Sequence, residues 1–333
     1  MEESEIKLFY YQMHNGSLIS GRMSTSFLSE INRRVLLFDG AMGTEIQKLN
    51  PRIEDFPNGK EGFNDGLVLT NPEWIENIHN SYLEAGADCI ETNTFGSNQI
   101  KLSEYGFGDK TIEINRVSAQ LAAKICSEYK DKPRFVVGSM GPTGFLPSSN
   151  DPDLGNIDPD TIINAYFLQA QGLIAGNVDV LLIETSQDIL EVKLAIEGCL
   201  KAIEETTKKI PVIANITLDK YGKMLLGTDV QSAYTTVSDM GISGFGLNCS
   251  TGPVEMGPSI RWLNEQREVP ILVMPNAGMP INDCGNAVYK MTPSELAREL
   301  NAYLGKYGNI RMIGGCCGTT PNHIRELSKI LNV

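Results

Sequence analysis

The sequence predicts a single (β/α)8 barrel, and three features of the chain indicate this fold. From residue 35 onward, short apolar runs alternate with longer amphipathic stretches, which is typical of βα units and a parallel sheet. Eight such runs in about 300 residues fit a closed barrel better than an open doubly wound sheet. Nearly every run ends in a small group of Gly, Asn, Thr, Asp or Cys. Barrel enzymes build their sites at the carboxyl ends of strands, so these groups should converge on one face.

The strand boundaries and the domain organisation follow from the same pattern. Residues 1–34 do not join it, and we expect an N-terminal extension packed on the barrel exterior or partly disordered, with one possible short helix at residues 26–34. Residues 35–333 are expected to form the barrel. Amphipathic stretches such as 72–86 and 294–308 predict the intervening helices. The eight strands are expected at residues 35–39, 88–95, 134–140, 179–185, 211–218, 244–249, 270–276 and 310–315.

The amino-acid composition and net charge indicate which kinds of partner and location to expect for this protein. Of the 333 residues, 41% are hydrophobic, which allows a sizeable core. The formal net charge of −13 argues against nucleic acid or an anionic membrane as a main partner. The sequence shows no secretory signal pattern and no apolar run approaching the ~18 residues of a membrane span, so a cytoplasmic location is expected. In a reducing cytosol, seven cysteines point to metal binding or catalysis rather than disulfides.

Three of the cysteines form a candidate metal site. Cys316 and Cys317 are adjacent, lie between glycines and follow the last expected strand, whereas Cys249 ends the sixth. Glycines allow the backbone to depart from strand geometry, so both neighbouring sulfurs can turn inward. Three thiolates at ~2.3 Å would hold zinc and leave one tetrahedral position open, as in a catalytic site. A vicinal disulfide, or two cysteines acting as small core residues, are the alternatives for the adjacent pair.

The other cysteines and the histidines carry no comparable signal. Cys89 lies within an expected strand, Cys126 and Cys199 within expected helices, and Cys284 in a loop, so we interpret them as core or loop-filling residues. The three histidines show no ligand spacing, and imidazole is not expected in the metal shell. These histidines are His14, His79 and His323.

Five sequence motifs resemble the homocysteine S-methyltransferase family, in particular the homocysteine-binding domain of cobalamin-dependent methionine synthase. They are FDGAMGT at 38–44, DCIETNTFGSN at 88–98, GLNC at 246–249, MPNAG at 274–278 and GGCCGTTPNHI at 314–324. The resemblance covers about residues 35–331. It implies a (β/α)8 barrel, methyl transfer to the sulfur of homocysteine, and a zinc ion held by Cys249, Cys316 and Cys317.

The ammonium and carboxylate groups of homocysteine also need partners. The resemblance assigns Asp39 and Glu184, each at the end of a strand, to the ammonium group. Alternatively, Asp39 opens a turn and Glu184 pairs with a buried Arg or Lys. For the carboxylate, an anion-binding concavity can form from the backbone amides of Gly40, Ala41, Met42, Gly43 and Thr44. This segment lacks the spacing of a dinucleotide or phosphate fingerprint.

Several asparagines and a threonine also lie at expected strand ends. The resemblance supports Asn276 as a side-chain oxygen that reaches zinc when substrate is absent, although Asn is also a common turn former. For the remaining four we expect only supporting or loop-capping roles. They are Asn93, Thr94, Asn215 and Asn248.

The methyl donor is the least determined part of the reaction. The motifs favour the cobalamin-dependent branch, yet the chain shows no second barrel for methyltetrahydrofolate and no DxHxxG corrinoid motif. Methylcobalamin is therefore expected on a separate corrinoid protein, or the chain is a fragment of a larger enzyme. Alternatives are S-methylmethionine, S-adenosylmethionine or betaine as donor, or a noncatalytic subunit that docks a corrinoid protein.

Overall fold

The computed structural model describes residues 25–283 and 286–332, and within them the predicted barrel is present. Eight parallel strands follow one another in the order β1-β10-β7-β6-β5-β4-β3-β2, and a parallel bridge between Phe38 and Cys89 joins the two ends. Seven strands lie within the runs that the sequence predicts for them, and β4 extends one residue beyond its run, to Ser186. The strands are β1 (Leu36–Leu37), β2 (Cys89–Glu91), β3 (Phe135–Met140), β4 (Val180–Ser186), β5 (Val212–Ile216), β6 (Gly244–Asn248), β7 (Ile271–Met274) and β10 (Ile310–Ile313).

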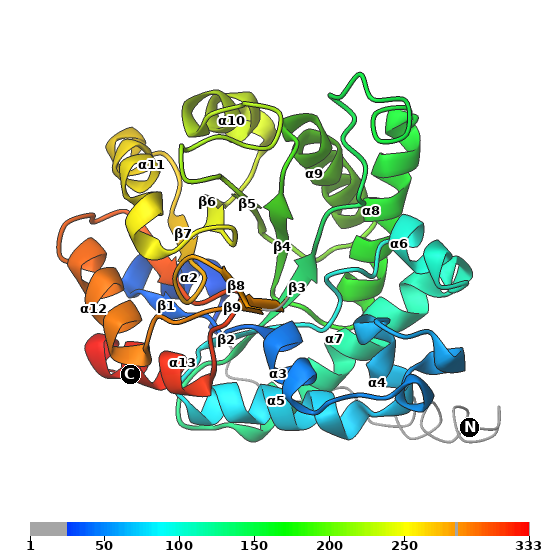
Figure 1. Ribbon diagram of the computed structural model, residues 1–333, viewed down its shortest axis with the longest axis horizontal. Coiled ribbons are helices and arrows are strands. Elements are labelled where there is room, and N and C mark those ends of the chain that lie inside the picture. The colour runs from blue at the N-terminus through cyan, green and yellow to red at the C-terminus, as the bar shows by residue number, and fades with distance from the viewer. Residues whose placement is uncertain (1–24, 284–285, 333) are drawn as a thin grey trace.

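Helices surround the ring of strands, as Figure 1 shows. None of the described helices is long and apolar enough to cross a membrane. Short 3-10 turns lie at Ile53–Asp55, Pro57–Gly59, Asn64–Gly66, Gly108–Lys110 and Ser238–Met240. The α-helices are α2 (Phe27–Arg33), α3 (Met42–Lys48), α4 (Leu67–Thr70), α5 (Pro72–Glu84), α6 (Gln99–Glu104), α7 (Thr111–Glu128), α8 (Pro159–Ala175), α9 (Ile189–Glu204), α10 (Val230–Val237), α11 (Pro253–Gln266), α12 (Pro293–Leu304) and α13 (Pro321–Leu331).

The strands are apolar because both of their faces are covered. Side chains alternate along a strand, so one set faces the helices and the other fills the barrel. The inner set includes Cys89, Val137 and Leu182, which belong to one buried cluster. Two residues further along these same strands stand Glu91, Ser139 and Glu184. The interior therefore changes from apolar to polar toward the carboxyl ends of the strands.

Helix α2 closes the amino-terminal end of the barrel. Phe27 and Ile31 are buried in the same cluster as the inner strand residues, and the Phe27 ring meets the rings of Phe38 and Phe135 at centroid distances of 6.4 and 5.5 Å. Ser26 caps the helix by accepting a hydrogen bond from the amide of Ser29. The predicted short helix is thus present, and its apolar face belongs to the barrel core instead of resting on the exterior. The domain boundary at residue 35 stays a prediction.

A two-stranded hairpin that the sequence analysis did not anticipate follows β7. Strands β8 (Ile281–Asp283) and β9 (Asn286–Val288) pair antiparallel, and in Figure 1 they project across the centre of the ring. Tyr289 comes directly after β9, and its ring packs so closely on Gly318 that a Cβ there would lie 2.3 Å from it. The hairpin is therefore connected to the carboxyl-terminal face, next to the loop that carries Cys316 and Cys317.

Candidate functional site

The three predicted thiols meet at the carboxyl-terminal face of the barrel. The Sγ atoms of Cys249, Cys316 and Cys317 all lie within 4.8 Å of one another, and those of Cys249 and Cys317 are 3.7 Å apart. All three are free thiols and partly exposed, which contradicts both a vicinal disulfide and a role as buried core residues. Among the described residues, this is the one group of three or more Cys, His, Asp or Glu side chains with metal-site spacing.

Unusual backbone conformations bring the sulfurs together. Cys249 and Ser250 have φ values of 60° and 61°, in the left-handed region that residues with a side chain rarely adopt. On the other loop, Gly318 has φ 77° and directly follows the cysteine pair. A Cβ at Gly315 would lie 2.5 Å from the Thr319 hydroxyl, so only glycine fits there. The glycines around the pair thus allow the turn that the sequence predicts for them.

The Cys317 thiol forms hydrogen bonds with the other two thiols and with Tyr289, the residue after the hairpin. Hydrogen bonds from the Cys249 and Cys316 thiols and from the Tyr289 hydroxyl lower the pKa of Cys317. Donors gathered around one sulfur favour its thiolate form, which is the form that binds metals. Tyr289 is a site residue with no local sequence signal, because its place beside Cys317 depends on the hairpin.

Glu184 lies beside the thiols and is held by two donors. The Ser139 hydroxyl donates to its Oε1 at 2.5 Å, and the Asn248 side-chain amide donates to its Oε2 at 3.0 Å. Neither partner is an Arg or Lys, so the alternative of a buried ion pair is wrong. Burial raises the pKa of Glu184 to about 7, against the lowering effect of the hydrogen bond from Ser139.

Asn248 connects Glu184 to the backbone of the site. Its side chain accepts a hydrogen bond from the Thr185 amide at 2.8 Å and donates to the Thr185 hydroxyl at 2.8 Å. Thr185 has φ 58° and lies where the β4–β5 register shifts. Asn248 immediately precedes Cys249, so one side chain links the carboxyl on β4 to the thiol after β6. This is the supporting role that the sequence analysis expected for it.

Asp39 and Glu91 supply two further carboxyls near Glu184. Asp39 is buried and its Oδ2 accepts a hydrogen bond from the Glu91 amide at 3.0 Å. Burial, together with the Glu184 carboxyl, raises the pKa of Asp39, and the pKa of Glu91 is raised by burial and by both neighbouring carboxyls. The sequence analysis overlooked Glu91. Glu91 lies two residues after Cys89 on β2, so both side chains must face the barrel interior. This spacing was the sequence signal that could have identified Glu91.

The predicted anion-binding segment begins helix α3. The Ala41 amide already donates to the Thr319 hydroxyl at 3.2 Å, and Gly40 lies against Thr319 and Tyr82. The first intrahelical bond of α3 is donated by Glu45 to the Ala41 carbonyl, so the amides of the first turn have no acceptor within the helix. These amides belong to Met42, Gly43 and Thr44.

Of the remaining predicted residues, two have unpartnered side-chain atoms and two cap loops. Asn276 is buried, and within the described part of the chain its Oδ1 has no hydrogen-bond partner. The amide of the next residue, Ala277, donates to the Cys317 carbonyl at 3.0 Å. Asn93 and Thr94 cap loops, donating to the Asn64 and Ser139 carbonyls. Asn215 is fully buried, and neither polar atom of its side chain has a partner among the described residues.

The cysteines and histidines outside the thiol site have structural surroundings. Three cysteines are buried in the core, as expected: Cys89, Cys126 and Cys199. His79 is buried in α5, and His323 contacts Thr320 and the Met291 carbonyl at the start of α13. The predictions for Cys284 and His14 lie outside the described residues.

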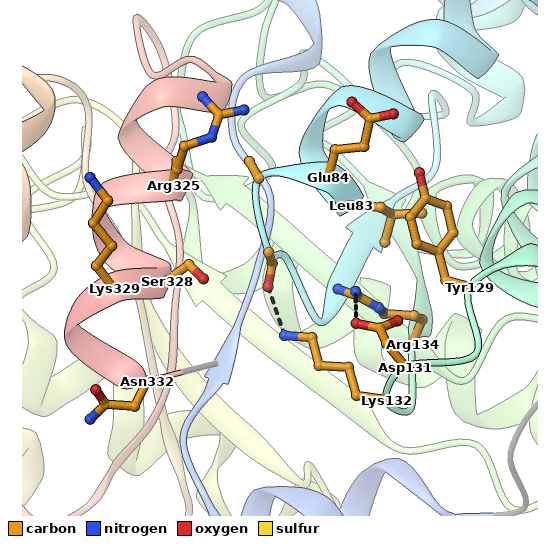
Figure 2. Close-up of a pocket in the computed structure, with 12 residues that line it drawn as sticks. Leu83, Glu84, Tyr129, Asp131, Lys132, Arg134, Arg325, Ser328, Lys329 and Asn332 are labelled. Atoms are coloured by element: carbon orange, nitrogen blue, oxygen red, sulfur yellow. Dashed lines mark hydrogen bonds and ion pairs between the residues drawn. The ribbon is translucent and has the colours of Figure 1, made fainter.

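A separate pocket of about 470 Å³ lies at the opposite end of the barrel (Figure 2). Its cations are all paired already. Lys132 contacts Asp88 and the Gly86 carbonyl, Arg134 pairs with Asp131, and the two cations of α13 bind Asn322 and Glu326. The loops around this pocket precede β2 and β3, so it lies away from the carboxyl-terminal face. The ion pairs and hydrogen bonds of its charged side chains link these loops to one another.

Fold and site together define a (β/α)8 barrel protein with a thiol site at the face where barrel enzymes bind their substrates. The chain belongs to the homocysteine S-methyltransferase family, whose sequence model matches residues 36–331. This confirms the family resemblance read from the motifs.

Individual relatives agree with this assignment. The chain is 40% identical over 306 residues to the methionine synthases of Mycobacterium tuberculosis (strain ATCC 25618 / H37Rv) and Mycobacterium leprae (strain TN). These alignments cover 91% of the chain but 25% of each relative, so the chain spans about a quarter of their length.

Solved structures show the same fold. The chain matches the homocysteine methyltransferase MmuM from Escherichia coli with a TM-score of 0.71 for the oxidized form and 0.70 for the metallated form. The sequence identities are 21% and 22%, and the matches cover 89% of this chain and 95% and 96% of the MmuM chains. The predicted (β/α)8 barrel is therefore confirmed by structural similarity.

Proposed function

We propose that this chain transfers a methyl group to the thiol of homocysteine, giving methionine, with zinc bound by Cys249, Cys316 and Cys317. The observation that carries the proposal is the convergence of three free thiols within 4.8 Å of one another. Three sulfur ligands fit zinc, and a three-ligand set leaves a tetrahedral position for the substrate. Family membership supports homocysteine as the substrate.

The residues present fit such a metal ion. When bound, zinc would hold the homocysteine sulfur as a thiolate at neutral pH, where a free thiol with a pKa near ~8.5 is mostly protonated. Donors gathered on Cys317 already favour its thiolate form. The unpartnered Oδ1 of Asn276 supports the role of an oxygen that occupies the open position before substrate arrives.

Other residues would bind and orient the amino acid. Asp39 and Glu184 would accept hydrogen bonds from its ammonium group, because both carboxyls lie buried at this face. Its carboxylate would meet the amides from Gly40 to Thr44, three of which have no acceptor within helix α3. With the sulfur held by zinc as a thiolate, no general base would be needed, and positioning the sulfur in line with the methyl donor would supply much of the remaining rate.

The expected donor is methylcobalamin, presented by a corrinoid protein or module. The similarity to methionine synthases supports this choice. Nucleic acid and membranes are not expected partners of a chain with a net charge of −13. Similarity of fold to MmuM does not favour another donor, because identity near 21% shows the fold alone.

Parallel assays with four donors test the proposal. The purified protein should contain about one zinc per chain and form methionine from homocysteine and free methylcobalamin. Its rate should rise nearly in proportion to methylcobalamin concentration, because the donor in this assay is free in solution and is not held near the site by a corrinoid module. The other three donors are S-methylmethionine, S-adenosylmethionine and betaine. Cys316→Ala should lose both zinc and activity, whereas Cys199→Ala, at a buried cysteine away from the site, should keep its zinc.

The outcomes separate the parts of the proposal. Protein without zinc under reducing conditions would remove the metal assignment. Turnover with S-methylmethionine but not with methylcobalamin would replace the donor and leave the metal site intact. Zinc and homocysteine binding without turnover from any donor would favour a docking subunit or a chain that acts only within a larger assembly.

A further inference from the structure

Two buried acceptors at the mouth of the barrel have no donor. Oδ1 of Asp39 and Oε1 of Glu91 are buried, and no described residue donates a hydrogen bond to either. A buried carboxyl oxygen without a partner is costly, and such atoms concentrate where a ligand supplies the donor. Asp39 is 2% exposed, whereas Glu91 is partly exposed.

These two carboxyls lie beside Glu184 on one side of the thiols. The Glu91 amide binds Asp39 at 3.0 Å, and the Phe38–Cys89 bridge joins their strands. Glu184 faces the interior from β4, and its charge acts on both Asp39 and Glu91. Carboxyls that act on one another in this way repel when ionised, and a cation bound among them would relieve that repulsion. No Arg or Lys side chain of the described residues forms an ion pair with any of the three, so a cationic group of a ligand would be the partner that favours their ionised forms.

We propose that Glu91 is the third carboxyl of a cup that binds the ammonium group of the substrate. Asp39, Glu91 and Glu184 would each accept one of the three N–H bonds of a primary ammonium ion. The cup would therefore select thiols that carry a free α-ammonium group over thiols without one. This rests on the proposed function in that homocysteine is the substrate, and it adds Glu91 as the residue that completes the recognition of the amino group.

A comparison of two thiols tests this role. Homocysteine and 4-mercaptobutanoate differ only in the amino group, and their binding to zinc-loaded protein can be measured by isothermal titration calorimetry. Glu91→Gln should weaken homocysteine binding about 10- to 100-fold, as expected for a lost hydrogen bond to a charged group. It should change the affinity for 4-mercaptobutanoate less than about threefold. Glu91→Ala serves as a second variant if the glutamine variant does not fold.

Asp65→Asn is the matched control. Asp65 is another carboxyl of this face and accepts a hydrogen bond from the Gly96 amide at 3.1 Å, but its pKa is set by burial and by its own hydrogen bonds and not by the other three carboxyls. This variant should bind both thiols like the wild type. The inference is overturned if Glu91→Gln binds homocysteine as tightly as the wild type, or if it weakens both thiols equally.

A metal-free measurement keeps the two proposals distinguishable. L-methionine and 4-(methylthio)butanoate also differ only in the amino group, and they need no zinc–thiolate bond. Metal-free wild-type protein should prefer L-methionine, and Glu91→Gln should lose this preference. Equal affinity of the wild type for both ligands would overturn the ammonium cup, even in a protein that binds zinc. A protein that lacks zinc yet prefers L-methionine would instead overturn the metal site alone.

Discussion

At the scale of single residues, the position of a side chain along its strand decides its role. On β2, β3 and β4, an inward apolar residue is followed two positions later by Glu91, Ser139 and Glu184. The same alternation that fills the barrel thus supplies the polar groups of the site. Polar groups placed at this level are buried, which is why the pKa values of all three carboxyls of the site are raised.

A different buried residue makes stability depend on pH. His79 is fully buried, neither of its ring nitrogens has a hydrogen-bond partner among the residues that the structure describes, and burial lowers its pKa to about 4. The unfolded chain takes up this proton below about pH 6.5, while the folded chain does not. Stability is therefore full above that pH and is lost as the pH falls toward 4. At pH 5 the loss is about 2 kcal/mol.

Replacing His79 by Leu should remove this loss. Urea unfolding at pH 8 and pH 5 gives the free energy of unfolding at each pH for both proteins. The decrease between the two pH values should be about 2 kcal/mol smaller for His79→Leu than for the wild type. An equal decrease in both proteins would show that His79 is not the residue that responds to acid.

At the scale of elements, helix α2 completes the core. An open barrel end would leave Phe38 and Phe135 exposed to water, and Phe27 covers both rings. Glu30 on the same helix binds Arg34, which in turn pairs with the buried Asp88 before β2. One short helix therefore joins the segment before β1 to the loop before β2.

Alanine substitutions on the buried and the exposed face of α2 should lower the free energy of unfolding by very different amounts. Phe27→Ala removes a buried ring and should lower the free energy of unfolding by about 3–5 kcal/mol. Leu28→Ala, next to it on the exposed face at 41% exposure, should change it by less than about 0.5 kcal/mol. Urea unfolding monitored by circular dichroism measures both. Similar values for the two variants would mean that α2 does not close the barrel in solution.

At the scale of the whole molecule, the thiol site proposed to bind zinc and the barrel core are separate. The two buried clusters that hold strands and helices together contain none of the three site thiols. The site thiols lie in loops after β6 and β10. In barrel proteins such loops hold the functional residues, while the strands and helices supply the stability.

Removing the metal should therefore leave the fold in place. After treatment with a chelator the far-UV circular dichroism should be unchanged. The melting temperature should fall by a few degrees, since a ligand at a hundredfold its dissociation constant adds about 2.7 kcal/mol. Cys316→Ala should melt at one temperature with or without zinc. Loss of secondary structure on chelation would instead assign the metal a structural role.

The sequence by itself determined the barrel, its eight strands and the residues that end them, because the alternation of apolar runs and amphipathic stretches is a local property. It also identified the three thiols, since cysteines between glycines at strand ends are recognisable without coordinates. Only the tertiary structure decided what lies around them. The place of Glu91 beside Asp39 depends on the closure of the ring between β1 and β2. Tyr289 reaches Cys317 through a hairpin with no clear sequence signal.

The conformation of the thiol loops was likewise beyond the sequence. Positive φ values at Thr185, Cys249 and Ser250 oppose the local preference of these residue types. They are stabilised by contacts from distant strands, such as the hydrogen bonds between Asn248 and Thr185. Local sequence sets the periodicity of each helix and strand. The convergence of side chains from six or more strands depends instead on strand register and barrel closure, and no single segment encodes these.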